Sequence, residues 1–139
     1  MLKDKIGKAR ALDPDYIEII SKRNNKYTRY YIDKKSRGKR EILHPSKELK
    51  VLQRWLVYNI FNNFQESKFS YAYSKGDSIR KNALAHKQSK YILHSDIKNF
   101  FPSINREMLG HFFNSNTEIV KNLRLSEADL KLIMDICLY

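Results

Sequence analysis

Cysteine, glycine and proline are all scarce in this sequence of 139 residues. It has one cysteine, Cys137, which excludes an internal disulfide, and its four histidines follow no metal-ligand spacing, which excludes a structural zinc site. With four glycines and three prolines against a hydrophobic content of 42%, the chain is neither collagen-like nor of low complexity. These scarcities indicate an ordinary, helix-rich globular protein.

Long hydrophobic runs are also missing. The longest runs, such as that from Trp55 to Tyr58, are far short of the roughly 18 residues that a membrane-spanning helix needs. The N-terminus, MLKDKIGKARALD, lacks the apolar stretch of a signal peptide. We therefore expect a cytoplasmic protein with no membrane partner. The length suits one compact unit, which buries about two-thirds of the surface of the unfolded chain, and is too short for two full domains.

Acidic residues are outnumbered by basic residues, and the excess lies in the first hundred positions. The chain has 27 Lys and Arg against 15 Asp and Glu, a net charge of +12. Residues 1–50 carry 15 basic and 7 acidic side chains and residues 51–100 carry 8 and 3, whereas residues 101–139 carry 4 and 5. Basic segments rich in Tyr favour nucleic-acid binding, because the cations neutralise phosphates and the rings stack on bases. A basic surface kept for solubility is the alternative, and composition does not decide between them.

The first part of the chain predicts a helix followed by a hairpin. Asp13 and Pro14 supply an N-cap and a first-turn proline for a short helix that ends near Lys22. The segments 27–33 and 40–44 are rich in β-branched and aromatic residues and predict two strands. The polar turn between them makes the hairpin tip strongly basic, with Lys34, Lys35, Arg37, Lys39 and Arg40.

A core helix is predicted next. Ser46 can cap a helix whose apolar positions 49, 52, 55, 56, 60 and 64 recur close to the helical period. A weak extended segment at 69–73 and a short helix from Ser78 to His86, capped by Asp77, follow. We expect four aromatic side chains of this half to pack against the fold rather than to stack on bases: Tyr30, Tyr31, Trp55 and Tyr58.

The last part of the chain predicts a buried strand at 91–96 and then helices. Asn105 is the expected cap of one helix, 117–123 forms another, and the last runs from Ser126 to Tyr139 with a capping box formed by Ser126 and Asp129. No stop signal follows this last helix, so we expect the chain to be cut rather than finished. The order of elements predicts an α+β domain.

Asp96 is the main candidate for chemistry. A carboxylate at the end of a buried strand is well placed to hold Mg²⁺, because hard cations take oxygen ligands and the strand fixes their direction. Two aromatic residues and a proline follow within six positions, downstream of a basic hairpin. The alternative is an Asp that only terminates the strand and caps the next segment.

The residues around Asp96 resemble a known family. The run YILHSDIKNFFPSI, residues 91–104, looks like motif A of bacterial reverse transcriptases, in which a strand ends in the first catalytic Asp. Residues 39–46, KREILHPS, with Leu49, Lys50 and Gln53, resemble the fingers strand and the following helix of these enzymes. Residues 73–82, YSKGDSIRKN, are similar to the next block, and 82–86, NALAH, fits a pattern associated with retron reverse transcriptases. The resemblance covers about residues 27–113.

The resemblance implies an incomplete right-hand fold: a helix-rich fingers region at 1–90 with the basic hairpin, and the start of a polymerase palm at 91–139. It implies an RNA template and primer, a deoxynucleoside triphosphate and two Mg²⁺ ions, which such chemistry holds with carboxylates from two strands. The chain contains no YxDD and no two adjacent Asp. We therefore expect it to be inactive alone and to need the remaining palm and thumb in cis or in trans. A role in phage defence is implied only by the resemblance.

The resemblance also assigns roles to residues. Asp96 would bind both metals together with the backbone carbonyl of Ile97, Phe101 would face the sugar of the nucleotide, and Phe100 would lie in the core. Arg40 would lie over the triphosphate, with Lys35 or Lys34 as a weaker candidate, because cationic groups stabilise a transferring phosphate. Contacts to the nucleic-acid backbone are expected from Lys34, Arg37, Lys39, Ser78, Arg80, Lys81 and Asn82.

Alternatives remain for these assignments. Lys34 fits a solvated turn, the 78–86 segment fits a capped surface helix, and His86 fits a structural residue better than a catalyst. For the whole chain, the alternative to part of a reverse transcriptase is a non-catalytic RNA-binding module derived from the fingers. A basic regulatory or structural protein would require the motif match to be coincidence.

Overall fold

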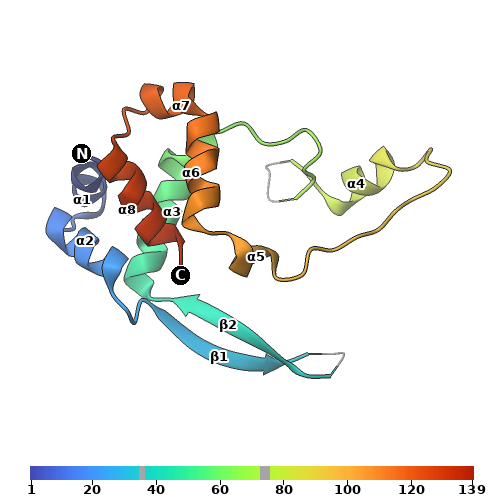
Figure 1. Ribbon diagram of the computed structural model, residues 1–139, viewed down its shortest axis with the longest axis horizontal. Coiled ribbons are helices and arrows are strands. Elements are labelled where there is room, and N and C mark those ends of the chain that lie inside the picture. The colour runs from blue at the N-terminus through green and yellow to red at the C-terminus, as the bar shows by residue number, and fades with distance from the viewer. Residues whose placement is uncertain (35–36, 73–75) are drawn as a thin grey trace.

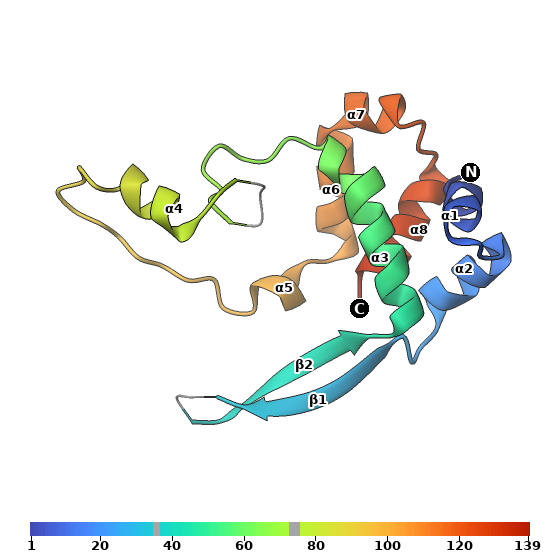
Figure 2. The ribbon, with the colours of Figure 1, turned by 180° about the vertical axis from the view of Figure 1, so that it is seen from behind.

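A helical body with two protrusions makes up the protein (Figures 1 and 2). The computed structural model describes residues 1–34, 37–72 and 76–139. The helical body comprises residues 1–26, 46–64 and 104–139. One protrusion is a β-hairpin, and the other is the exposed segment, residues 65–103. None of the described helices is both long and apolar enough to cross a membrane.

The first helix, α1 (Leu2–Arg10), was not predicted from the sequence. Only Leu2 and Ile6 form an apolar face in an otherwise charged stretch, yet both side chains are fully buried against the body. The chain then folds back so closely that a Cβ on Gly7 would lie 2.6 Å from the carbonyl oxygen of Leu12. Tertiary packing, not periodicity, therefore explains this helix and its glycine.

Helix α2 (Pro14–Lys22) confirms the predicted start at Asp13. The Asp13 carboxylate accepts hydrogen bonds from the backbone N–H groups of Asp15, at 2.7 Å, and Tyr16, at 3.2 Å. Pro14 occupies the first turn, where its missing N–H costs nothing. An ion pair of 2.9 Å between Lys3 and Asp15 links α2 to α1.

The predicted hairpin is confirmed. Strands β1 (Tyr27–Asp33) and β2 (Lys39–Pro45) pair antiparallel, with Tyr27 opposite Pro45 and Asp33 opposite Lys39. Gly38 has a φ of 87°, a left-handed conformation that the tight turn requires and that glycine adopts without strain. These are the only paired strands among the described residues.

The predicted core helix is also confirmed as α3 (Lys47–Asn59), continued by the short 3₁₀ helix η1 (Phe61–Asn63). The Ser46 hydroxyl caps α3 by accepting the backbone N–H of Leu49 at 3.2 Å. All six predicted apolar positions are buried: Leu49, Leu52, Trp55, Leu56, Ile60 and Phe64.

Three further helices complete the body: α6 (Arg106–Ser115), α7 (Thr117–Asn122) and α8 (Glu127–Cys137). Asn105 caps α6, and Ser126 with Asp129 forms the predicted capping box of α8. The last helix ends earlier than expected, because Leu138 is already extended. Both caps confirm the prediction, whereas the helical end at Tyr139 is wrong.

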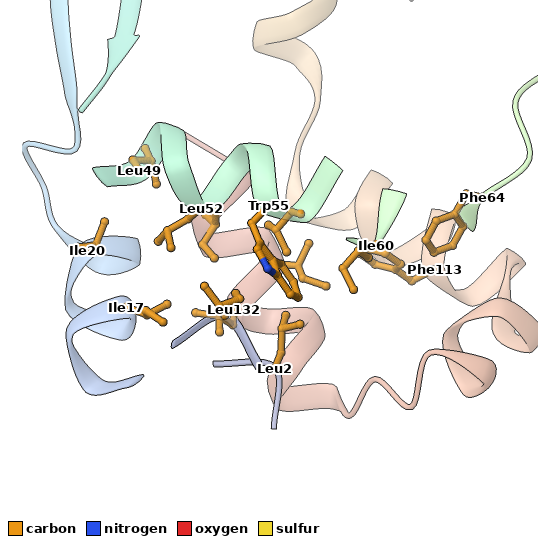
Figure 3. Packing of buried hydrophobic residues seen from close by; sticks show 14 residues of the cluster. Leu2, Ile17, Ile20, Leu49, Leu52, Trp55, Ile60, Phe64, Phe113 and Leu132 are labelled. Atoms are coloured by element: carbon orange, nitrogen blue, oxygen red, sulfur yellow. The ribbon is translucent and has the colours of Figure 1, made fainter. Parts of the chain in front are cut away.

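One hydrophobic core joins these elements (Figure 3). It brings α1 and α2 against α3, α6 and α8, so that residues from both ends of the sequence share one interior. At one end of the core, the Phe64 ring packs on Phe112 and Phe113, with ring centroids 4.8 and 6.0 Å away. The buried members are Leu2, Ile6, Ile17, Ile20, Leu49, Leu52, Trp55, Leu56, Ile60, Phe64, Phe113, Leu132, Ile133 and Ile136.

The exposed segment confirms the predicted short helix at 78–86 but not the predicted strand. It contains α4 (Ile79–Ala85) and α5 (Phe100–Ser103) and no described strand. The strand expected at 91–96 is wrong: these residues are irregular and exposed, with Leu93 at 93%. A strand needs a neighbour to pair its backbone groups, and no other described segment pairs with this one. Of the weak extended segment at 69–73, residues 69–72 form turns or bends and Tyr73 lies outside the described residues.

The aromatic residues divide between core and surface. Trp55 packs in the core as predicted. Tyr30, Tyr31 and Tyr58 are exposed, so the expectation that they pack is wrong. Phe100, expected in the core, is half exposed because the segment around it leaves the body. The helix-rich α+β class is confirmed, while the division into fingers at 1–90 and a palm start at 91–139 stays a prediction.

Candidate nucleotide and nucleic-acid site

The Asp96 segment, residues 91–99, is an irregular connection that leads into α5. The side chains of Asp96 and Ile97 are exposed, and Asn99 has a left-handed φ of 56° just before α5 begins. The Ser103 hydroxyl donates a hydrogen bond of 2.7 Å to the backbone carbonyl of Phe100, which closes the short helix. The structure thus places Asp96 in solvent, not at the end of a buried strand.

Metal binding requires more donors than this segment provides. No group of three or more His, Cys, Asp or Glu side chains that could hold an ion occurs among the residues described. Two Mg²⁺ ions need several carboxylates around them. Asp96 and the carbonyl of Ile97 therefore do not form a metal centre by themselves, and their role as metal ligands stays a prediction.

Phe101 lies at a cleft between the hairpin and the body. The cleft has a volume of about 640 Å³ and is mostly apolar. Phe101 and Pro102 come from α5, and the edge ring contact between Phe100 and Phe101 has a centroid distance of 5.3 Å. One predicted nucleotide residue therefore lines the same cleft as Glu41 and Leu43 of β2. The full lining is Tyr27, Glu41, Leu43, Phe101, Pro102, Ile104, Leu109, Cys137, Leu138 and Tyr139.

Arg40 lies on the other face of the hairpin. Side chains alternate along a strand, and directly paired residues share a face. Glu41 and Leu43 line the cleft, so Arg40, which pairs with Ile32, projects from the opposite face. In this structure Arg40 and Phe101 are consequently not brought together over one nucleotide.

The hairpin face toward the cleft carries a side-chain network that the sequence motifs do not indicate. The Arg29 guanidinium forms an ion pair of 3.0 Å with Glu41, whose carboxylate also accepts a hydrogen bond from the Tyr31 hydroxyl at 3.3 Å. Arg29 also donates to the hydroxyl of Tyr139 and lies 5.6 Å from the centre of its ring. Opposite charges two positions apart across an antiparallel pair are the sequence signal for such a contact.

The root of the hairpin is tied to the end of α8. Lys26 donates hydrogen bonds from its ammonium group to the backbone carbonyls of Ser21, at 3.0 Å, and Asp135, at 2.6 Å. Burial lowers the pKa of Lys26, and the nearby Asp135 carboxylate only partly offsets this. The Tyr27 ring meets the Tyr139 ring edge-on, with centroids 5.5 Å apart. The hairpin thus leaves the body at an orientation that these contacts fix.

The thiol of Cys137 lines the same cleft. Burial raises its pKa to about 11, with the charge of Lys26 opposing the shift. A thiol with so high a pKa is protonated at neutral pH, and only a thiolate is a strong nucleophile. At neutral pH Cys137 is therefore a neutral thiol in the cleft wall.

The basic residues of the hairpin tip are exposed. Lys34, Arg37 and Lys39 all face solvent, and the backbone N–H of Lys34 donates to the carbonyl of Gly38 at 2.8 Å to close the turn. Lys35, the second candidate for the triphosphate, lies outside the described residues. The tip presents positive charge well away from the core.

Helix α4 carries the remaining predicted nucleic-acid residues. Its cap is the Ser78 hydroxyl, which accepts the backbone N–H of Lys81 at 3.2 Å, so the predicted cap at Asp77 is wrong. The Asp77 carboxylate instead lies 3.5 Å from the Lys81 ammonium. Arg80 and Asn82 are exposed on the same helix. His86 is the C-cap residue of α4 and is exposed.

Comparisons with known proteins identify relatives of this chain by sequence. The retron Ec73 reverse transcriptase of Escherichia coli is 37% identical over 109 residues, which are 76% of this chain and 34% of that protein. The retron Ec86 reverse transcriptase of the same species is 38% identical over 92 residues, or 65% of this chain and 29% of that protein. The retron Ec48 reverse transcriptase of Escherichia coli is 30% identical over an alignment of 149 positions, which covers 96% of this chain and 35% of that protein.

No family model matches the chain, and no solved structure matches it. The matches to curated proteins nevertheless agree with one another, since each of these relatives is a retron reverse transcriptase. The chain spans about a third of the length of these relatives. By its sequence, this chain is thus a relative of the bacterial retron reverse transcriptases.

Proposed function

We propose that this chain contributes the nucleic-acid-binding part and the first metal-binding carboxylate of a retron-type RNA-directed DNA polymerase. One observation carries the proposal: the identity to several retron reverse transcriptases extends over most of a chain that contains the run around Asp96. The polymerase would bind an RNA template and primer together with a deoxynucleoside triphosphate. Asp96 and Ile97 would supply oxygen ligands for Mg²⁺, and carboxylates from the remaining palm, in cis or in trans, would complete the two-metal site.

Within this proposal, the chain's own residues bind and position. Phe101 would limit the space beside the nucleotide sugar from its place at the cleft. The exposed cations of the hairpin tip and of α4 would contact phosphates, because each neutralised phosphate releases counterions. The placement of Arg40 and Lys35 over the triphosphate stays a prediction. A triphosphate bound by Arg40 would lie on the hairpin face opposite the cleft that Phe101 lines.

A second function deserves a test because the described residues form no metal group by themselves. In this alternative, the chain is an RNA-binding module without catalysis. The two functions share salt-dependent RNA binding and differ in whether Asp96 matters for DNA synthesis.

The experiment replaces the matched third of the retron Ec73 reverse transcriptase with this chain and measures primer extension on an RNA template. We expect extension by the chimera and a loss of several orders of magnitude in Asp96→Asn, because the substitution keeps the side-chain volume but removes the charge that holds the ions. Binding of Mn²⁺, followed by its paramagnetic signal, should weaken in the same variant while its melting temperature is unchanged.

Asp4→Asn is the matched control, because Asp4 is an exposed carboxylate of α1. It should leave extension unchanged. Normal extension by Asp96→Asn would overturn the catalytic proposal. A chimera that binds RNA but extends no primer, with or without Asp96, would favour the RNA-binding module.

A further inference from the structure

The two walls of the cleft come from different parts of the chain. One wall is the hairpin, which contributes Tyr27 and residues of β2. The other wall is the segment from α5 to α6, which contributes Phe101 and Ile104. The end of α8 lies between the root of the hairpin and α5 (Figures 1 and 2) and also lines the cleft. The separation of the two walls therefore depends on how each is attached to α8.

The hairpin wall is attached to the backbone of α8. In the last turn of this helix, the carbonyls of Asp135 and Ile136 receive no backbone donor from the described residues. Side chains supply the missing hydrogen bonds: Lys26 donates to the Asp135 carbonyl at 2.6 Å, and the Gln53 amide donates to the Ile136 carbonyl at 3.1 Å. The same amide donates to the Tyr27 hydroxyl at 2.9 Å. The root of the hairpin and the neighbouring α3 together cap α8.

The opposite wall is attached through the side chain of the same α8 residue. Arg106 is the first residue of α6, and its guanidinium donates to the Asp135 carboxylate. Asp135 is only 7% exposed, and a buried carboxylate that loses its cation is left uncompensated, so this contact is costly to break. Ile104, two positions before Arg106, lines the cleft. Asp135 thus holds one wall with its carbonyl and the other with its carboxylate.

We propose that Lys26 and Arg106, acting through Asp135, set the separation of the cleft walls and thereby the room beside the sugar of a bound nucleotide. The inference deepens the proposed function and rests on it for the place of the sugar beside Phe101. Neither Lys26 nor Arg106 is among the described residues that line the cleft, so both are positioning residues. A wider cleft accommodates a sugar with one more hydroxyl group. Loosening either contact should therefore weaken the preference for deoxyribonucleotides over ribonucleotides.

The test measures kcat/KM for dCTP and for CTP in single-nucleotide extension by the Ec73 chimera. Lys26→Met keeps the length of the side chain but removes its donors, and we expect the ratio of the two values to fall by about tenfold. Arg106→Met should lower the ratio in the same direction, and Arg106→Lys, which keeps a cation on Asp135, should restore part of it. A merely stabilising role would reduce the amount of folded enzyme and leave the ratio unchanged.

A matched control lies four positions before Lys26. Lys22 is an exposed lysine whose ammonium pairs with Glu18 at 2.6 Å, so Lys22→Met should leave the ratio within about twofold. An unchanged ratio in Lys26→Met overturns the inference, even if that variant melts earlier. An equal fall in Lys22→Met overturns it as well, because the effect would then follow from lost charge and not from the contact with α8.

The separation of the walls is also measurable without DNA synthesis, in the 139-residue chain. Spin labels at Lys39→Cys on β2 and Met108→Cys on α6 report the distance between the walls by double electron–electron resonance. We expect a broader and longer distribution in Lys26→Met than in the labelled parent or in Lys22→Met. An unchanged distribution overturns the inference.

The two measurements separate this inference from the proposed function. If the chimera extends no primer while the distance distribution broadens in Lys26→Met, the positioning of the walls stands and the polymerase proposal falls. If the chimera extends primers and Lys26→Met keeps the full preference for dCTP, the polymerase proposal stands and this inference falls.

Discussion

The helical body and the exposed segment contain similar apolar residues in opposite environments. In the body, residues such as Ile17, Leu52 and Phe113 are buried between helices from distant parts of the chain. In residues 65–103, none of the described side chains is buried, although Phe69, Ile92 and Leu93 are just as apolar. The difference shows that hydrophobicity marks a side chain for burial only when another element packs over it.

The hairpin lies between these two cases. The hydrogen bond from Lys26 and the ring contact between Tyr27 and Tyr139 attach its root to the helical body. Its tip projects away from the helical body (Figure 1), and the side chains on the face opposite the cleft are exposed except for Ile42, which is half-buried. A protrusion held at one end in this way presents its side chains to solvent in a fixed arrangement.

The largest effect should come from removing a core ring. We expect Phe113→Ala to lower the free energy of unfolding by about 3–5 kcal/mol, because Phe113 is 2% exposed and its loss leaves a cavity. Phe69→Ala, at a site that is 76% exposed, should change it by less than about 0.5 kcal/mol. Urea denaturation of both variants measures the contrast, and equal losses would mean that the exposed segment packs in solution.

A smaller effect should come from the helix caps. The buried Asp129 carboxylate accepts the backbone N–H of Leu2 at 2.6 Å and caps α8 through Ser126, so it joins the start of α1 to the start of α8. Asp129→Ala should cost about 2 kcal/mol. Ser78→Ala removes the cap of the exposed α4 and should leave global unfolding unchanged. Thermal melts of both variants test whether α4 unfolds independently of the body.

The Asp129 contribution depends on pH. Burial opposes ionisation of this carboxyl group, but hydrogen bonds from Leu2 and Ser126 outweigh burial and hold its pKa below the usual value of 3.8. Because the folded pKa is lowered, the stabilisation is present above that value and is lost as the pH falls through the folded pKa. Asp129→Ala should therefore flatten the acid side of the stability profile, and an unchanged profile would contradict the assignment.

The smallest effect concerns the single thiol. With a pKa of about 11 against the usual 9.0, Cys137 should react with iodoacetamide at pH 8 about a hundredfold more slowly than an exposed thiol. Ser89→Cys in the exposed segment supplies that reference thiol, compared by mass spectrometry. The raised pKa also means that the neutral thiol stabilises the fold fully below pH 9 and that this stabilisation is lost as the pH rises to about 11. Equal reaction rates would show that the end of α8 opens in solution.

Local signals predicted much of the body. The caps at Asp13, Ser46, Asn105 and Ser126 and the six apolar positions around α3 all follow from short-range patterns, because a cap or a helical face involves residues within a few positions of one another. The hairpin follows from its strand residues and Gly38 for the same reason. The run around Asp96 also indicated a reverse transcriptase, and the run NALAH at 82–86 indicated the retron group, since both are contiguous in the sequence.

What the sequence by itself determined, therefore, is the set of local elements, the basic hairpin and the relationship to retron reverse transcriptases. Only the tertiary structure decided that α1 is a core helix and that residues 91–96 lie unpaired in solvent. It also decided that Phe101 lies on one side of the hairpin, at the cleft, whereas Arg40 projects from the other side. Each of these features depends on which distant segment lies alongside. Leu2 is buried only because α8 covers it, and a strand forms only beside a pairing neighbour. The two faces of the hairpin differ because the helical body lies against one of them only. Such contacts join residues that are far apart in the chain, and short-range sequence patterns therefore do not predict them.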